Sequence, residues 1–206
     1  MTTATSPHRI SAIQIDQARQ MPDPRLAVLP EPRLAVLIGG NSSGYQFTDA
    51  DCERLLAGLE SQLAKGASLM ITLSRRSPPA LAAHLAARMQ QHQGRVFIWD
   101  GKTSNPYTAI LALADGVIVT ADSVNMISEA AATGKPLHIF TPSGSMPKVE
   151  RFIANLSKKV IVRNTIDVLA EGTYPPLNST PEIARELLRR YDIFRQSTPS
   201  PSGAKE

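Results

Sequence analysis

The sequence predicts an α/β fold: a doubly wound, Rossmann-like parallel sheet of about six strands. Short runs of leucine and β-branched residues recur along the chain, and segments with helical spacing separate them. The runs are apolar throughout and do not alternate with polar residues, which is typical of parallel strands covered by helices on both faces. We therefore expect a ligand site beyond the carboxyl ends of the strands, where the strand order reverses.

Composition limits the possible functions. The chain has 206 residues, 42% hydrophobic and 19% charged, as expected for one globular domain with tails. A net charge of +4, few aromatics and no Lys/Arg run give no indication of a nucleic-acid-binding surface. The single Cys52 excludes an intramolecular disulfide and a cysteine-based metal site. No secretory signal is visible, and the longest apolar stretch, Ala109–Thr120, is too short to span a bilayer. We expect a cytoplasmic protein, and this expectation includes peripheral attachment to the inner membrane.

The chain divides into tails, a connector and one domain. Residues 1–8 and 195–206 are polar and rich in Pro, Ser or Thr, so we expect disordered tails. Residues 9–32 form a connector with a short helix at Ile10–Gln20. The domain at 33–194 contains the predicted strands, which are Leu34–Ile38, Leu69–Leu73, Arg95–Ile98, Gly116–Thr120, Leu137–Phe140 and, more weakly, Lys159–Val162.

Helix signals lie between the strands. Asp49–Lys65 has leucines at four-residue spacing, with Thr48 as the predicted N-cap and Asp51 three residues later. Asn105 is the predicted N-cap of a helix at Pro106–Ala114. The other predicted helices are Pro78–Gln91, Val124–Thr133 (stopped by Gly134), Val149–Leu156 and Pro181–Phe194.

The loop after the first strand has a composition suited to anions. Gly39 and Gly40 are followed by Asn41, Ser42 and Ser43 before a helix begins. Glycines let the backbone approach a ligand, and free N–H groups at a helix N-terminus suit a phosphate. The spacing matches neither the dinucleotide fingerprint nor the P-loop. A glycine turn that only lets strand and helix pack explains the loop equally well.

Two further loops end at the same predicted edge. Ser74 precedes adjacent arginines, and Arg75 is a candidate to hold phosphate oxygens, although surface arginines are common. Trp99 either stacks on a base or closes the core. Backbone groups of Ile98, Trp99, Asp100 and Gly101 could bind the edge of a base whatever their side chains are.

The loop after the fourth strand leads into a helix with one unexplained carboxylate. Asp122 or Ser123 is expected to cap the helix that begins at Val124. Glu129 gains about 0.3–1 kcal/mol from the helix dipole, which is enough to explain it as a surface residue. The alternative is an acceptor for sugar hydroxyls, the role of acidic groups on ribose in other doubly wound domains. Local chemistry favours the surface interpretation.

The longest motif is ALADGVIVTADSVNMISEAAATGKPLHIF, which is similar to the donor-nucleotide motif of GT-B glycosyltransferases. Together with the other motifs it resembles a bacterial mitochondrial-fission-like family, related to the plant "elongated mitochondria" protein, over about residues 8–192. The matching segments are Leu29–Pro32, Arg33–Ser42, Thr72–Pro78, Trp99–Gly101, Asn105–Tyr107, Leu111–Asp115, Thr120–Pro136 and Pro175–Asn178.

The resemblance implies the C-terminal, donor half of a GT-B-like fold, which binds a nucleotide-sugar, here of the UDP type. It places Gly39–Ser43 and Ser123 at the diphosphate, Ile98–Gly101 at the base and Glu129 at the ribose. Arg75 and the Lys148–Arg151 region are further carry-overs. The remaining predicted substrate-binding residues are Ser74, Asp122, Met126 and Ser128. No metal or cofactor is expected, because backbone dipoles and cationic side chains stabilise the departing diphosphate in such enzymes.

The resemblance also implies what is missing. Members of the family have two domains, and the acceptor half, which usually supplies the catalytic base, precedes the connector. Here the connector begins close to Met1, so we expect this chain to be a donor domain that transfers a hexosyl group only when an acceptor domain is present. That acceptor domain would be supplied by a separate chain. Self-association of the donor domain is a further expectation. The catalytic residues are unknown. The alternatives are a non-enzymatic, fission-protein-like interaction module and another enzyme of phosphate ligands, such as an epimerase.

Overall fold

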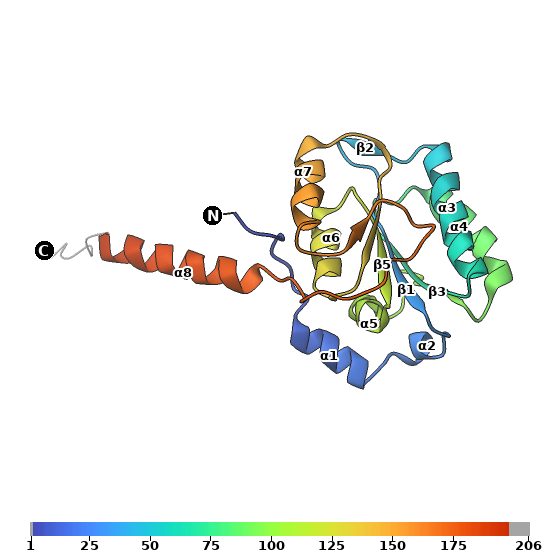
Figure 1. Cartoon of the computed structure of the whole chain (residues 1–206), viewed down its shortest axis with the longest axis horizontal. Helices are drawn as coiled ribbons and strands as arrows, with labels where there is room; N and C mark the ends of the chain where they lie inside the picture. The colour runs from blue at the N-terminus through green and yellow to red at the C-terminus, as the bar shows by residue number, and fades with distance from the viewer. Residues whose placement is uncertain (1, 198–206) are drawn as a thin grey trace, which may run out of the picture.

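The computed structural model describes residues 2–197 and confirms the α/β fold class (Figure 1). Six parallel strands form one sheet in the order β4-β3-β1-β5-β6-β8. The strands are β1 Arg33–Ile38, β3 Ser68–Leu73, β4 Val96–Ile98, β5 Gly116–Thr120, β6 Leu137–Phe140 and β8 Val162–Arg163. The five stronger apolar runs all became strands. The weakest, Lys159–Val162, contributes only its last residue, because β8 lies further along the chain.

The strand order reverses between β1 and β5. β1 pairs with β3 on one side and with β5 on the other. The chain therefore builds the sheet outward from β1 in one direction through β3 and β4, and outward from β5 in the other direction through β6 and β8. In doubly wound sheets the carboxyl ends of such a pair open into a crevice that binds ligands. The loops that follow Ile38 and Thr120 therefore lie at the position where a site is expected.

Helices cover both faces of the sheet. Along β1, Leu34, Val36 and Ile38 pack on one face against α3 and α4, whereas Ala35 and Leu37 pack on the other. Successive side chains of a strand point to opposite faces, so an apolar run needs both layers. The first layer holds α3 Asp49–Ala64 and α4 Pro79–Met89 with the 3-10 turn Gln90–His92, and the second holds α1 Ala12–Gln20, α2 Pro24–Ala27, α5 Tyr107–Leu113, α6 Val124–Ala131 and α7 Pro147–Leu156 (Figure 1).

The cap of α3 was predicted correctly and that of α5 was not. Thr48 and Asp51 form a capping box, in which each side chain accepts the other's backbone N–H, at 3.2 and 3.1 Å. At α5 the prediction of Asn105 as N-cap is wrong by one residue, because Pro106 lies outside the helix. Asn105 still accepts the N–H of Tyr107 at 3.0 Å.

A short ribbon was not predicted. β2 Tyr45–Gln46, in the loop after β1, pairs antiparallel with β7 Ser143–Gly144, in the loop after β6. Asp51 adds a second link, because its carboxylate accepts the N–H of Ser143 at 3.0 Å. Strands of two residues are too short to show a hydrophobic period, so sequence patterns could not reveal them.

The N-terminal segment is ordered against the body, contrary to the expectation of a disordered tail for residues 1–8. Thr5 and His8 are buried. The backbone N–H groups of Thr5, Ser6 and His8 donate to hydroxyls of Ser179, Ser128 and Thr180. A polar side chain of the segment itself also takes part, because the hydroxyl of Thr5 accepts the N–H of Ser179 at 3.0 Å.

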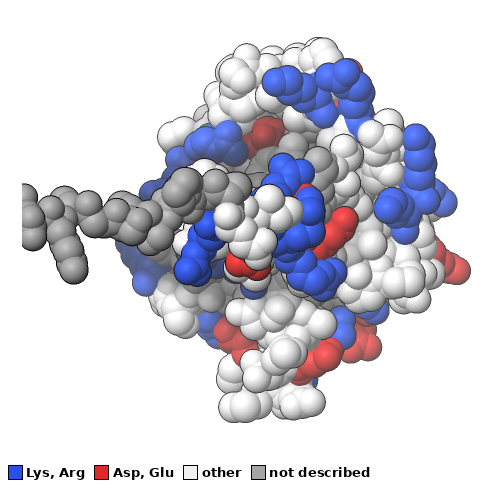
Figure 2. All heavy atoms as spheres, turned by 90° about the vertical axis from the view of Figure 1, so that its left-hand side faces the viewer, with Lys and Arg blue, Asp and Glu red and all other residues white. Residues whose placement is uncertain are grey.

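The last described helix, α8 Thr180–Ser197, projects away from the sheet (Figure 1). It includes residues 195–197 of the expected tail, whereas 198–206 lie outside the described residues. Figure 2 views the molecule from the side on which α8 projects and shows Lys and Arg spread over this side among fewer Asp and Glu. Across residues 2–197, no helix is long and apolar enough to span a bilayer.

Candidate functional site

A cavity of about 390 Å³ opens at the carboxyl ends of β1, β3 and β4, beside the first turns of α6. It brings together side chains from four loops and helices that are distant in the sequence. The residues in its wall that matter here are Ser74, Arg75, Trp99, Tyr107, Met126 and Glu129. Five of these six were predicted from the sequence, and Tyr107 was not named as a site residue.

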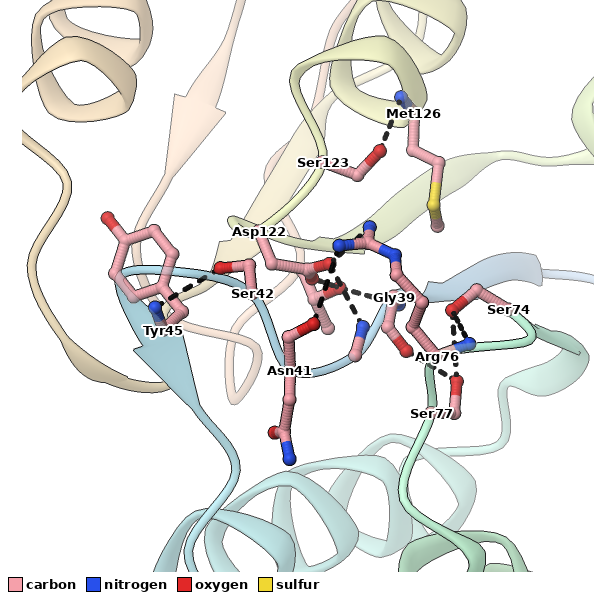
Figure 3. A network of polar contacts seen from close by, with 12 residues as sticks. Gly39, Asn41, Ser42, Tyr45, Ser74, Arg76, Ser77, Asp122, Ser123 and Met126 are labelled. Atoms are coloured by element: carbon pink, nitrogen blue, oxygen red, sulfur yellow. Dashed lines mark hydrogen bonds and ion pairs between the residues drawn. The ribbon is translucent and has the colours of Figure 1, made fainter.

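Asp122 lies in the crevice between β1 and β5, with a fully buried side chain (Figure 3). Its carboxylate accepts hydrogen bonds from the N–H of Gly40 at 2.9 Å and the hydroxyl of Thr120 at 2.6 Å. The guanidinium of Arg76 lies 3.1 Å away and forms an ion pair with it. Asp122 therefore does not cap α6; Ser123 does, accepting the N–H of Met126 at 3.4 Å.

The two glycines of the first loop are required by packing within the protein. A Cβ on Gly39 would lie 2.2 Å from the carboxylate of Asp122, and one on Gly40 would lie 1.9 Å from the carbonyl oxygen of Arg76. Side chains cannot be accommodated at such distances from backbone or from a buried carboxylate. The packing interpretation thus accounts for both glycines without any ligand.

The rest of this loop is shaped by its own side chains. Asn41 accepts the N–H of Phe47 at 2.8 Å, and Ser42 accepts the N–H of Tyr45 at 3.2 Å. Ser43 is exposed at the tip. The backbone N–H of Ser42 also donates to the carbonyl oxygen of Tyr45, at 2.9 Å, so this N–H is not available for the predicted phosphate contact.

Of the two adjacent arginines, each takes a different place. Arg75, chosen from the sequence, lies in the wall of the cavity. Arg76, which was not chosen, points into the crevice toward Asp122 and is half exposed. The backbone N–H of Arg76 donates to the hydroxyl of Ser74 at 3.1 Å. No periodicity separates the two arginines, so only the three-dimensional structure distinguishes them.

Glu129 faces the cavity and is held by a tyrosine. The hydroxyl of Tyr107 donates to Oε2 of Glu129 at 2.6 Å. Burial raises the pKa of Tyr107 far above its usual range, and the negative charge of Glu129 raises it further. The phenol thus remains a donor at any physiological pH. In the described part of the chain no hydrogen bond occupies Oε1 of Glu129, which leaves this oxygen as an acceptor.

The loop after β4 is also internally fixed. Asp100 accepts the N–H groups of Thr103 and Lys102 at 3.0 and 2.9 Å, and these bonds lower its pKa to about 2. Gly101 has a φ of +72°, which only glycine adopts without strain. The indole of Trp99 donates to the carbonyl of Thr103 at 3.2 Å. This bond orients the ring at the cavity wall.

Ser128 is not brought to the cavity. Its hydroxyl donates to the carbonyl of Val124 at 2.8 Å and accepts the N–H of Ser6 at 3.0 Å. It anchors the N-terminal segment instead, so its prediction as a ligand contact does not fit the structure. Elsewhere among residues 2–197, no group of three or more His, Cys, Asp or Glu side chains could hold a metal ion.

Comparison with known proteins places the chain among described relatives. A sequence model of the family described as "Mitochondrial fission ELM1" matches residues 1–191. The chain is 32% identical over 185 residues to mitochondrial fission protein ELM1 of Arabidopsis thaliana, covering 88% of this chain and 43% of that protein. It is 34% identical over 157 residues to the uncharacterized protein RP120 of Rickettsia prowazekii, and this match covers 72% of this chain and 44% of RP120. The chain thus spans less than half the length of both relatives.

Among solved structures, one that resembles the chain is E. coli ADP-heptose lps heptosyltransferase II. The match has a TM-score of 0.47 and 14% identity, and covers 93% of this chain and 54% of that one. Likeness at this level says nothing about what the chain binds.

Proposed function

The chain belongs to the mitochondrial fission ELM1 family, and from this premise we propose that it is the nucleotide-sugar-binding domain, of the UDP type, of a glycosyltransferase-like protein. The observation that carries the proposal is the carboxylate of Glu129, which Tyr107 holds at the wall of an aromatic-lined cavity. The cavity lies next to the point where the strand order reverses, which is the usual ligand position in such sheets.

Each part of a nucleotide-sugar has a complementary group at this edge. The ring of Trp99 and the backbone after β4 suit the base, because aromatic faces stack and backbone groups pair with base edges. The free oxygen of Glu129 suits ribose hydroxyls, which donate to carboxylates. Glu129 is the sixth of the eight residues of α6 and lies beyond its first turn, so the helix dipole does not explain a carboxylate in this largely apolar wall, whereas a ribose contact does.

The diphosphate would lie across the crevice between β1 and β5. The first N–H groups of α6 have no partner within the helix and face this edge, and Ser123 lies at its start. Arg76 supplies a cation that Asp122 keeps in place. Arg rather than Lys suits a diphosphate, because its planar fork can bind two oxygens at once. In this proposal the charge is held without a metal.

The proposed activity needs more than this chain. Transfer of a hexosyl group requires an acceptor hydroxyl and a base close to the anomeric carbon. In the proposal these come from an acceptor domain, and the chain corresponds to less than half of its relatives. The donor domain would bind the nucleotide-sugar in the cytoplasm and present it to that partner.

Calorimetric titration of the chain with UDP, UDP-N-acetylglucosamine, GDP-mannose and ADP tests the proposal. We expect a uridine nucleotide to bind best, and Glu129→Gln to weaken binding while the unfolding midpoint stays within a few degrees. Glu171→Gln, at an exposed carboxylate outside the cavity, is the matched control. If none of the four nucleotides binds, the proposal fails and the alternative of a non-enzymatic interaction module that keeps the fold is favoured.

A further inference from the structure

α8 exposes large apolar side chains along most of its length. Leu187 and Leu188 are each 62% exposed, and Tyr191 is 57% exposed. The helix leaves the body at Thr180 and extends away from it (Figure 1). Nothing in residues 2–197 covers these side chains. An exposed apolar surface of this kind marks an interaction site.

Most apolar residues of α8 share one face, and the exposed Ile193 lies away from it. Ile183, Leu187 and Tyr191 are four residues apart, and Ala184 and Leu188 are offset from them by one position. At 3.6 residues per turn these five positions form a single stripe along the helix. Arg189 lies on the opposite side. The 18 residues of α8 correspond to a rod of about 27 Å.

The charges that flank the stripe are arranged in opposite order along the helix. Glu186 and Arg190 flank one side of the stripe, and Arg185 and Asp192 flank the other. On each flank of the stripe, the acidic and the basic residue lie at about equal distances along the helix from a point close to Leu188, one before it and one after it. Two such helices that run in opposite directions about this point would place unlike charges level with each other on both sides.

We infer that α8 pairs antiparallel with α8 of a second copy of this chain, about a two-fold axis near Leu188. In this arrangement Glu186 lies level with the partner's Arg190, and Arg185 with the partner's Asp192. The large ring of Tyr191 lies over the small side chain of the partner's Ala184. A parallel pair would instead bring the Glu186–Arg190 side of one helix next to the Arg185–Asp192 side of the other, so a contact between Glu186 and the partner's Arg190 distinguishes the antiparallel pair.

The direction of α8 is compatible with this pairing. The helix projects from the body, so the two bodies would lie at opposite ends of the helix pair (Figure 1). The interface is isologous, as in most homodimers, and closes with two copies. A pair of helices of this length buries less than the ~1,600 Å² of a standard interface, so the dimer should depend on protein concentration.

Sedimentation equilibrium of the full chain over a range of concentrations tests the inference. We expect the average mass to rise from one to two chains. Glu186→Arg and Arg190→Glu should each weaken dimerisation by ten-fold or more, because each sets like charges against each other across the axis. Lys159→Glu, which makes a charge reversal at an exposed residue of the body, should leave the dimer unchanged.

Mixing the two single variants separates pairing between chains from stability of the helix itself. Glu186 and Arg190 also form an ion pair within one helix, at 2.7 Å, which either substitution removes. Neither variant regains the ion pair within its own helix on mixing. A Glu186→Arg chain and an Arg190→Glu chain nevertheless place unlike charges against each other across the axis, so they should form mixed dimers as tightly as the original chain forms its own. Circular dichroism should show the same helix content for both variants as for the original chain, since both are expected to retain α8.

Three results would overturn the inference. The chain could stay a monomer at all concentrations, as it would if another domain of a longer protein covers this face. It could form dimers that the two single variants leave intact. Or the mixture could remain as monomeric as its components.

Discussion

The hydroxyl of Tyr107 donates a 2.6 Å hydrogen bond to the carboxylate of Glu129, and so joins the first residue of α5 to the middle of α6. The two residues are 22 positions apart, and both lie in the cavity wall. Tyr107 occupies one oxygen of Glu129 and fixes the direction of the other. The bond therefore links the packing of two helices to the geometry of the proposed ribose contact.

Removal of the Tyr107 hydroxyl should weaken nucleotide binding more than it weakens the fold. In Tyr107→Phe, Glu129 loses its donor and its fixed orientation, at a cost of about 1 kcal/mol, equivalent to roughly five-fold in affinity. Calorimetry with UDP measures this. Tyr174→Phe is the control, because Tyr174 is a buried tyrosine that is not part of the cavity wall. Unchanged UDP affinity in Tyr107→Phe would show that the tyrosine does not position Glu129.

Asp122 should be essential for the stability of the crevice. Its buried carboxylate accepts from Gly40 and Thr120 and pairs with Arg76. In Asp122→Asn an amide NH₂ must face one of these donors, which we expect to cost about 2–3 kcal/mol of unfolding free energy; the half-exposed Arg76 limits the loss. Urea denaturation measures it. Asp16→Asn, at an exposed carboxylate paired with Arg19, should change stability by less than about 0.5 kcal/mol.

Gly40 should tolerate no side chain. In Gly40→Ala the added Cβ meets the backbone of Arg76 at 1.9 Å, so the loops after β1 and β3 must move apart. We expect a loss of roughly 3 kcal/mol or more, comparable to severe overpacking. Gly116→Ala, where the nearest atom is a flexible tip of Leu34 at 3.3 Å, should cost much less. Thermal unfolding of the two variants compares them, and equal losses would contradict this account.

Asp51 should make stability depend on acid pH. Burial alone raises its pKa, but hydrogen bonds from Arg54, Ser143 and Thr48 outweigh burial and hold the pKa well below its usual value. A group with a lowered folded-state pKa contributes its full stability above its unfolded pKa, about 3.9, and loses it as the pH falls below that value. The stability difference between the chain and Asp51→Asn should therefore shrink between about pH 5 and pH 3.

Urea unfolding at a series of pH values across this window measures the effect. Asp49→Asn, at an exposed carboxylate in the same helix turn, should retain the pH dependence of the original chain. A constant difference between the chain and Asp51→Asn from pH 6 to pH 3 would show that the bonds to Asp51 contribute nothing.

The sheet and most helices could be predicted because their signals are local. Apolar runs identified five of the six strands of the main sheet, and the capping box at Thr48 identified the start of α3. The position of the cavity also followed, since parallel strands end at one edge. Glu129 and Trp99 were found in its wall as expected.

Contacts between loops could not be predicted, because they depend on residues far apart in the chain. The choice between Arg75 and Arg76 depends on Asp122, which lies 46 positions from Arg76. The place of Ser128 depends on Ser6 at the N-terminus, 122 positions away. Tyr107 lies in the matching segment Asn105–Tyr107, but only its hydrogen bond to Glu129 indicates a role.

The ribbon of β2 and β7 has a consequence for affinity. It ties the loop after β1 to the loop after β6, so both are already ordered before anything binds. Fixing the backbone of a free loop costs about 1–2 kcal/mol per residue, and in a flexible loop this entropic cost would reduce the free energy of every binding event. In this protein the two loops already lose that freedom when the chain folds. A ligand at this edge would meet a preorganised surface, and its affinity would reflect contacts rather than the ordering of the chain.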